Sequence, residues 1–321
     1  MSACVATFAD LVAPIEPEAF FEKSWEKEPL HITRSEDIYE SVLTNRDVET
    51  VISSGGLRYP AIQLAKGGGC YPPEAFTRSL RSGGDVFTGI PVLERILAEY
   101  QAGATITLPG FHRAWKPLGA LAGAIEEEFD HPVHTNVYIT PGYTAGFAPH
   151  YDTHEVFVLQ IAGRKHWLIE KPPLRLPHRS QPFNPQNYVG TAPVLQVDLA
   201  PGDLLYLPRG FAHSTTTSDS FSVHVTLGVT VYTWIELLVE WAQSSRCIPS
   251  FRRALPPGFA GQQDNQKSLK DQLRRVIAEL QRLTGHDGLL EDFTRRVRQA
   301  RAGIGTEFKT DVTVTGGVNG G

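Results

Sequence analysis

Cysteine is scarce in this sequence, and its scarcity excludes several classes of protein. The 321 residues include three cysteines, Cys4, Cys70 and Cys247, and no two of them are spaced as a CxxC metal or redox motif. An odd number of widely spaced thiols argues against a disulfide framework and fits a reducing compartment. We therefore expect a cytoplasmic protein.

Long apolar runs and an excess of positive charge are also missing. No stretch approaches the ~20 apolar residues of a membrane-spanning helix, and the N-terminal segment lacks the features of a signal peptide. The 30 Lys and Arg stand against 35 Asp and Glu, so the net charge of −5 gives no whole-chain attraction for nucleic acid. The GxGxxG and GxxxxGK[ST] phosphate-binding motifs are absent in their strand and helix context. We expect neither membrane association nor direct nucleic-acid binding.

The composition that is present belongs to a globular protein. Hydrophobic residues make up 41% and charged residues 20% of the chain, which excludes a disordered tail, a collagen or a coiled-coil rod. Residues from about 8 to 130 mix both kinds of element: aromatic residues recur at helical spacing in 18–26, an extended piece begins at Pro29, and a helical period returns over 91–100. Glycines at 67–69 and 83–84 predict loops.

Short β-rich runs fill the region from about 134 to 231. Proline and glycine pairs separate them, which is typical of an antiparallel barrel or sandwich and not of alternating strands and helices. We expect an all-β core here. The runs are 135–140, 155–161, 166–169, 194–199, 203–207 and 220–227.

Amphipathic helices are predicted after Tyr232. The first covers 234–242, and two more carry apolar stripes, which consist of Leu269, Leu273, Val276, Ile277, Leu280 and Leu283, and of Leu289, Phe293, Val297 and Ala300. Two accounts of these stripes stay open: they pack on the β-core, or they form a dimerisation module. The residues from Gly303 onward are glycine-rich and should be flexible.

Three residues of the β-rich region could hold a metal ion. His150 and Asp152 stand two apart, so on a strand both side chains would project from the same face. His213 follows a Pro-Arg-Gly corner and is expected to enter a later strand. Two imidazoles and a carboxylate form the facial triad that holds Fe(II) and leaves positions open for O2 and a cosubstrate. The spacing can arise by chance, but the corner before His213 favours a metal site over structural histidines.

These segments resemble the jumonji-C-type, cupin-like branch of the Fe(II)/2-oxoglutarate oxygenases, and within it the ribosomal oxygenases. The resemblance covers roughly residues 15 to 235, and its motifs are 20–32, 136–141, 146–152, 158–167 and 207–213. It implies a mainly β protein with a double-stranded β-helix, or jelly-roll, core, an N-terminal α/β decoration and C-terminal helices. The implied domains are a catalytic domain over 1–232, a helical region over 233–302 that makes a homodimer, and a tail over 303–321.

The resemblance also implies roles for single residues. His150, Asp152 and His213 would ligate the catalytic Fe(II), and Lys165 would bind the far carboxylate of 2-oxoglutarate with support from Tyr138. These roles agree with the physical requirement: the far carboxylate of 2-oxoglutarate, buried in a dry core, needs a cation and a hydroxyl donor. A surface position for Lys165 and a core position for Tyr138 are the alternatives.

Four further residues are candidates for the same pocket. Asn136 shares the face of Tyr138 and could hydrogen-bond cosubstrate or substrate. His154 stands where the family usually has an aliphatic residue, and it lines a substrate pocket or faces solvent. His224 and Thr226 alternate on the strand after His213, where they face the interior of the core or simply pack.

The implied activity is hydroxylation of a protein or peptide side chain, with O2 consumed and succinate and CO2 released. A ribosomal protein is one candidate substrate. The family's winged-helix-like domain is not recognisable after the helices, which leaves a biosynthetic peptide or a small molecule as an alternative. Two further alternatives remain. One is a cupin enzyme that uses another metal without 2-oxoglutarate, and the other is a silent binding module. The three convergent ligands argue against the binding module.

Overall fold

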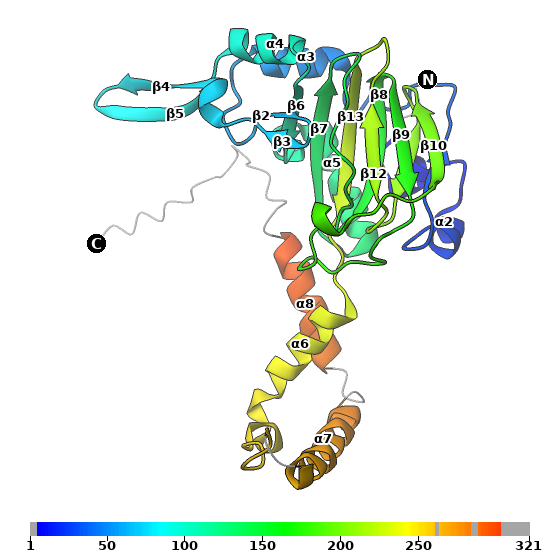
Figure 1. The fold of residues 1–321 in the computed structure, drawn as a ribbon, viewed down its shortest axis with the longest axis vertical. Helices are drawn as coiled ribbons and strands as arrows, with labels where there is room; N and C mark the ends of the chain where they lie inside the picture. The colour runs from blue at the N-terminus through cyan, green and yellow to red at the C-terminus, as the bar shows by residue number, and fades with distance from the viewer. Residues whose placement is uncertain (1–4, 261–262, 284–287, 303–321) are drawn as a thin grey trace, which may run out of the picture. The chain divides into compact units, whose positions relative to one another are not determined.

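The computed structural model describes residues 5–260, 263–283 and 288–302 (Figure 1). By its internal contacts the chain divides into two compact units, Met1–Val231 and Tyr232–Gly321. The glycine-rich tail predicted over 303–321 lies outside the described residues.

Two antiparallel sheets form the centre of the first unit (Figure 1). The larger has the strand order β1–β11–β8–β13–β7–β6–β2–β3, and the smaller has the order β10–β9–β12. Strands β4 and β5 form a separate hairpin. The strands are β1 (Leu30–Ile32), β2 (Gln63–Lys66), β3 (Gly69–Cys70), β4 (Thr77–Ser82), β5 (Asp85–Pro91), β6 (Thr105–Pro109), β7 (Val133–Thr140), β8 (Glu155–Gly163), β9 (Lys165–Glu170), β10 (Pro193–Leu199), β11 (Leu204–Leu207), β12 (His213–Thr216) and β13 (Ser222–Val229).

The central strands of the large sheet are buried on both faces, and for this reason the sequence of β8 is a continuous apolar run. Val156 and Val158 contribute to a cluster with Trp167 of β9 and Leu205 of β11, which joins the two sheets. Phe157 and its alternating neighbours face the opposite side, in a larger cluster with side chains of the helices. The predicted barrel or sandwich is therefore a sandwich of two sheets, and no closed barrel forms among the described residues.

Helices cover the outer face of the large sheet. Their apolar side chains, among them Phe8, Phe20 and Ile125, belong to the larger cluster. Helices α1 and α3 begin at capping boxes, in which a threonine and an aspartate three residues later satisfy each other's backbone amides. The helices of this unit are α1 (Phe8–Val12), α2 (Pro17–Lys23), α3 (Asn45–Ser53), α4 (Leu93–Gln101) and α5 (Lys116–Phe129).

The second unit contains the three predicted helices, α6 (Trp234–Ser244), α7 (Gln263–Leu283) and α8 (Gly288–Ala302). Leu273 and Ile277 of the predicted α7 stripe are exposed, and Phe293 of α8 contacts the ring of Tyr232. None of the described helices is long and apolar enough to span a membrane.

Candidate metal centre

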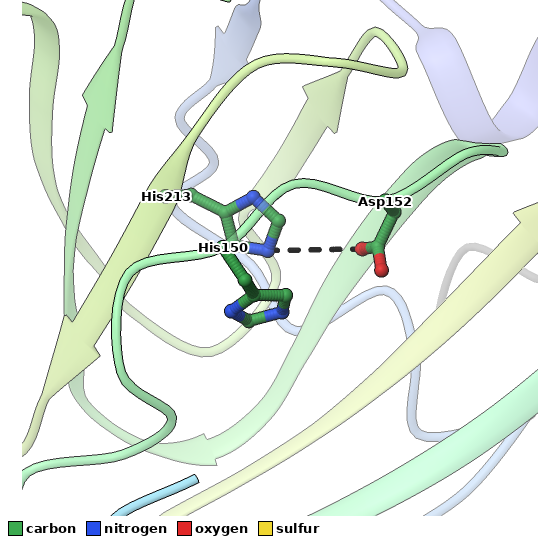
Figure 2. A group of neighbouring side chains, drawn as sticks. All are labelled: His150, Asp152 and His213. Carbon is green, nitrogen blue, oxygen red and sulfur yellow. Dashed lines mark ion pairs between the residues drawn. The ribbon is translucent and has the colours of Figure 1, made fainter. Parts of the chain in front are cut away.

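His150, Asp152 and His213 converge on one point (Figure 2). Each offers one ligand atom, and these atoms all lie within 4.8 Å of one another. His213 Nε2 lies 3.7 Å from Asp152 Oδ2, and the centroids of the two imidazole rings are 4.4 Å apart. The sequence prediction that these three residues meet is confirmed as a matter of geometry.

The local backbone differs from the prediction. His150 and Asp152 do not lie on a strand, because residues 151–154 are irregular and only His150 pairs, in an isolated bridge with His213. The amide of His150 donates to the carbonyl of His213 at 3.2 Å, and the amide of His213 donates to the carbonyl of His150 at 2.8 Å. The amide of Gly210 donates to the carbonyl of Asp152 at 3.0 Å. Strand alternation was therefore the wrong reason for the convergence. Backbone hydrogen bonds join the irregular segment of His150 and Asp152 to the corner at Gly210 and to His213, the first residue of β12, and so bring the ligands together instead.

Hydrogen bonds fix the tautomers of both imidazoles. His150 Nδ1 lies 2.8 Å from the carbonyl of Ala148, and His213 Nδ1 lies 3.1 Å from the carbonyl of Phe211. Because a carbonyl only accepts, Nδ1 carries the proton in each ring and the lone pair of Nε2 is left for a metal ion.

The charges of the triad suit a divalent cation. Burial raises the pKa of Asp152, but the neighbouring imidazoles, His154 and His213 foremost, outweigh burial and hold that pKa below its ordinary value. Burial lowers the pKa of His213 to about 4, and the nearby His150 adds to the shift. At neutral pH the site thus presents a carboxylate and a neutral His213, the protonation states that bind a metal.

A buried ion pair joins the two ligand-bearing segments. The Arg209 guanidinium donates to Glu155 at 2.7 Å and also pairs with Glu26, and the Tyr206 hydroxyl donates to Glu155 at 2.5 Å. Glu155 begins β8 just after Asp152, and Arg209 belongs to the corner that leads to His213. The corner itself requires glycine, because Gly210 has φ +91° and a Cβ there would lie 2.3 Å from a backbone oxygen.

Replacing Arg209 with methionine should destabilise the protein by about 3–5 kcal/mol, because it leaves the buried Glu155 unpaired. The free energy of unfolding in urea measures this. The same change at the exposed Arg175 is the control and should stay within about 0.5 kcal/mol of wild type. Adding Glu155→Gln to Arg209→Met should recover part of the loss, and equal stability of Arg209→Met and wild type would contradict the prediction.

All nine residues predicted for the site line one cavity of about 130 Å³. Two cross-strand pairs form part of its wall, since Tyr138 and Asn136 of β7 lie opposite His224 and Thr226 of β13. The rings of Tyr138 and His224 stack with centroids 4.8 Å apart. The lining residues are Asn136, Tyr138, Phe147, His150, Asp152, His154, Val156, Lys165, Trp167, His213, Ser214, Thr215, His224 and Thr226.

Lys165 is a buried cation without an anionic partner among the described residues. Its side chain is 3% exposed, and its Nζ donates to the hydroxyl of Thr140 at 3.1 Å. Burial lowers its pKa to about 7. An isolated buried charge is unfavourable, so this position is suited to bind an anion. The surface-lysine alternative is wrong.

Sequence reasoning missed five of the residues that line the cavity, among them Trp167, and also Thr140, which bonds to Lys165. Thr140 follows Tyr138 by two positions on β7, and Trp167 follows Lys165 by two positions on β9. Strand alternation from Tyr138 and Lys165 would have found both.

Comparisons with known proteins identify the domain. A model of the JmjC domain matches residues 115–237. Human ribosomal oxygenase 1 is 31% identical over 290 residues, which cover 85% of this chain and 43% of that protein. The Aedes aegypti bifunctional lysine-specific demethylase and histidyl-hydroxylase NO66 is 33% identical over 269 residues, covering 78% of this chain and 39% of that protein. The chain thus spans less than half the length of these relatives.

Solved structures share the fold. The Escherichia coli ribosomal oxygenase YcfD in complex with cobalt and succinic acid has a TM-score of 0.53 at 16% identity, covering 88% of this chain and 71% of that one. YcfD in complex with cobalt and 2-oxoglutarate has a TM-score of 0.50 at 16% identity, covering 82% and 67%. Residues 115–237 therefore form a JmjC domain, and the chain is homologous to the ribosomal oxygenases.

Proposed function

We propose that this protein is an Fe(II)- and 2-oxoglutarate-dependent oxygenase that hydroxylates a side chain of a protein or peptide. The observation that carries the proposal is the buried, unpaired Lys165 in the same cavity as a 2-His-1-carboxylate set. A metal enzyme without an anionic cosubstrate has no use for this cation, and a silent binding module has no use for either feature. The homologous ribosomal oxygenases and the complex of YcfD with cobalt and 2-oxoglutarate support the same function.

Different residues of the cavity would bind the metal ion and the cosubstrate. Nε2 of His150, Nε2 of His213 and the carboxylate of Asp152 would hold Fe(II), and the Lys165 ammonium with the Tyr138 hydroxyl would bind the far carboxylate of 2-oxoglutarate. Bound iron supplies the activation of O2. The net reaction takes 2-oxoglutarate, O2 and a substrate C–H to succinate, CO2 and a substrate C–OH. Trp167 and Val156 in the cavity wall exclude water from the reacting groups.

The test is succinate formation by the full chain under air with Fe(II), ascorbate and 2-oxoglutarate. We expect slow turnover by wild type without added substrate, none by His213→Ala, and the wild-type rate for His166→Ala, an exposed histidine on the outer face of β9. If wild type makes no succinate, 2-oxoglutarate is titrated into the anaerobic Fe(II) protein. Absence of binding there would refute the proposal.

A ribosomal protein is the first substrate class to test, because the relatives are named ribosomal oxygenases. The net charge of −5 favours an encounter with a basic partner. A biosynthetic peptide or a small molecule is the alternative. The scarcity of cysteine supports a cytoplasmic location for the reaction.

We also propose that the second unit forms a homodimer through α6. Trp234 is 79% exposed and Leu238 54% exposed, and Ile235 and Val239 extend the same apolar surface. Leu238→Glu should convert a dimer into a monomer in light scattering. The change Gln243→Glu, at an exposed polar position of α6, should leave the mass unchanged. A wild-type monomer would remove the proposal.

A further inference from the structure

A long connection, the segment 171–192, runs from the end of β9 to the start of β10. Its one element of regular structure is the 3-10 helix η3 (Pro185–Asn187). Connections of this length without helices or strands are uncommon in compact domains and usually have a function. Five of its residues are prolines, which restrict the backbone, so the segment is suited to hold one fixed shape.

One part of this segment contacts the residue that stands between two metal ligands. Tyr151 lies between His150 and Asp152, and its side chain is buried. The hydroxyl of Tyr151 donates to the carbonyl of Gln181 at 3.1 Å. Its ring contacts that of Phe183 edge to face, with the centroids 5.2 Å apart. Both contacts fix the backbone from which the two ligands project.

The last part of the segment is fixed beside the third ligand. The ring of Phe183 also contacts that of Tyr188, with centroids 5.4 Å apart, and the hydroxyl of Tyr188 donates to the carboxylate of Glu170. Glu170 ends β9, and its amide donates to the carbonyl of Ala212, the residue before His213, at 2.8 Å. A continuous series of contacts therefore leads from one ligand-bearing stretch of the chain to the other.

The first part of the segment packs against the corner before His213. A Cβ on Gly210 would lie 2.3 Å from the carbonyl oxygen of Leu174 and 2.7 Å from Cδ of Pro177. The amide of Gly210 in turn donates to the carbonyl of Asp152 at 3.0 Å. Both stretches of chain that carry the ligands drawn in Figure 2 are therefore in contact with this one segment.

We propose that the segment 171–192 positions the metal ligands through a clamp of four side chains. The clamp consists of Tyr151, Phe183, Tyr188 and Glu170. None of these four lines the cavity in the described part of the chain, so the clamp acts on the metal through the ligands and not by contact. Release of the metal requires the two ligand-bearing stretches to separate, so the clamp slows the loss of the metal, with Tyr151 as the positioning residue. This inference rests on the proposed function in one respect, that the triad binds a metal ion.

The experiment follows the release of Co(II) from the loaded full chain into excess EDTA, at EDTA concentrations that no longer change the rate. We expect Tyr151→Phe, which removes the hydroxyl and keeps the ring, to accelerate release about fivefold, the effect of one neutral hydrogen bond. Tyr188→Phe should accelerate it by a similar factor. Because the clamp is a series of contacts, breaking one link opens it, and the double variant should be no faster than the faster single variant.

Two controls separate positioning from general stability. Tyr143→Phe removes a hydroxyl from a tyrosine that is 83% exposed, and Ile125→Val loosens the buried core beneath the helices. Both should release Co(II) at the wild-type rate, although Ile125→Val also lowers the free energy of unfolding. A wild-type rate in Tyr151→Phe, the same acceleration in Ile125→Val, or effects that multiply in the double variant would overturn the inference. Failure of the wild type to bind Co(II) would instead overturn the proposed function.

Discussion

Asp152→Asn should lower the affinity for Fe(II) or Co(II) by about 100-fold or more and abolish succinate formation. The change keeps the shape of the side chain and removes the one negative charge that the triad offers to the cation. Even changes to groups outside the coordination shell cost about 10–100-fold in metal affinity, so loss of an anionic ligand should cost more. Co(II) titration of the metal-free protein measures the affinity directly.

A matched control distinguishes the loss of a metal ligand from the loss of an aspartate elsewhere in the fold. Asp198 of β10 is exposed and bonds to His166 at 2.9 Å, so Asp198→Asn removes the same charge away from the cavity. That variant should bind Co(II) as wild type does. Metal affinity of Asp152→Asn within threefold of the control would mean that the metal lies elsewhere.

The sequence was sufficient to predict the strands that carry the site, because an apolar run bounded by glycine and proline leaves few alternatives to a buried strand. The run 135–140 lies within β7, which begins two residues earlier, and the run 220–227 corresponds to β13 with a shift of two residues at each end. Alternation along these strands placed Asn136, Tyr138, His224 and Thr226 in one cavity. Residues that share a strand face can be predicted because side chains alternate between the two faces of a strand, and this alternation depends only on neighbouring positions in the sequence.

The remainder of the site depends on contacts between segments that are distant in sequence. His150 and Asp152 converge with His213 through backbone hydrogen bonds between an irregular segment and the start of β12, which no periodicity encodes. The pairing of Arg209 with Glu155 and the space that Gly228 leaves for His134 are of the same kind. A resemblance to a family supplies such contacts for its motifs, but it supplies nothing for His134, which no motif includes.

Lys165 gives a second large effect, in which the affinity for 2-oxoglutarate depends on pH. Burial without an anionic partner lowers its pKa to about 7, so the ammonium is present below pH 7 and is lost above it. Since the far carboxylate of 2-oxoglutarate needs the ammonium, affinity should be constant below about pH 7 and fall about tenfold per pH unit above it. Anaerobic titration of the Fe(II) protein by calorimetry, with uptake of one proton above pH 7, measures this.

Substitutions at Lys165 separate charge from shape. Lys165→Ala should weaken 2-oxoglutarate binding by about 100-fold at pH 6.5, since a charged hydrogen bond is worth about 1.5–3 kcal/mol. Lys165→Arg should bind with little pH dependence, because a guanidinium stays protonated. The exposed Lys171 is the control, and Lys171→Ala should behave as wild type. Flat affinity between about pH 6 and about pH 9 in wild type would show that another group binds the carboxylate.

The same lysine couples protein stability to pH in the absence of cosubstrate. Its pKa is about 7 in the folded protein and about 10.4 in an unfolded chain, so between these values the unfolded state binds more protons. The free energy of unfolding should therefore rise as pH increases from about 7 to about 10, relative to Lys165→Met. Saturating 2-oxoglutarate with Co(II) supplies the missing anion and keeps Lys165 protonated in the folded state, which should remove this rise. A rise that persists in Lys165→Met would assign the pH dependence to other groups.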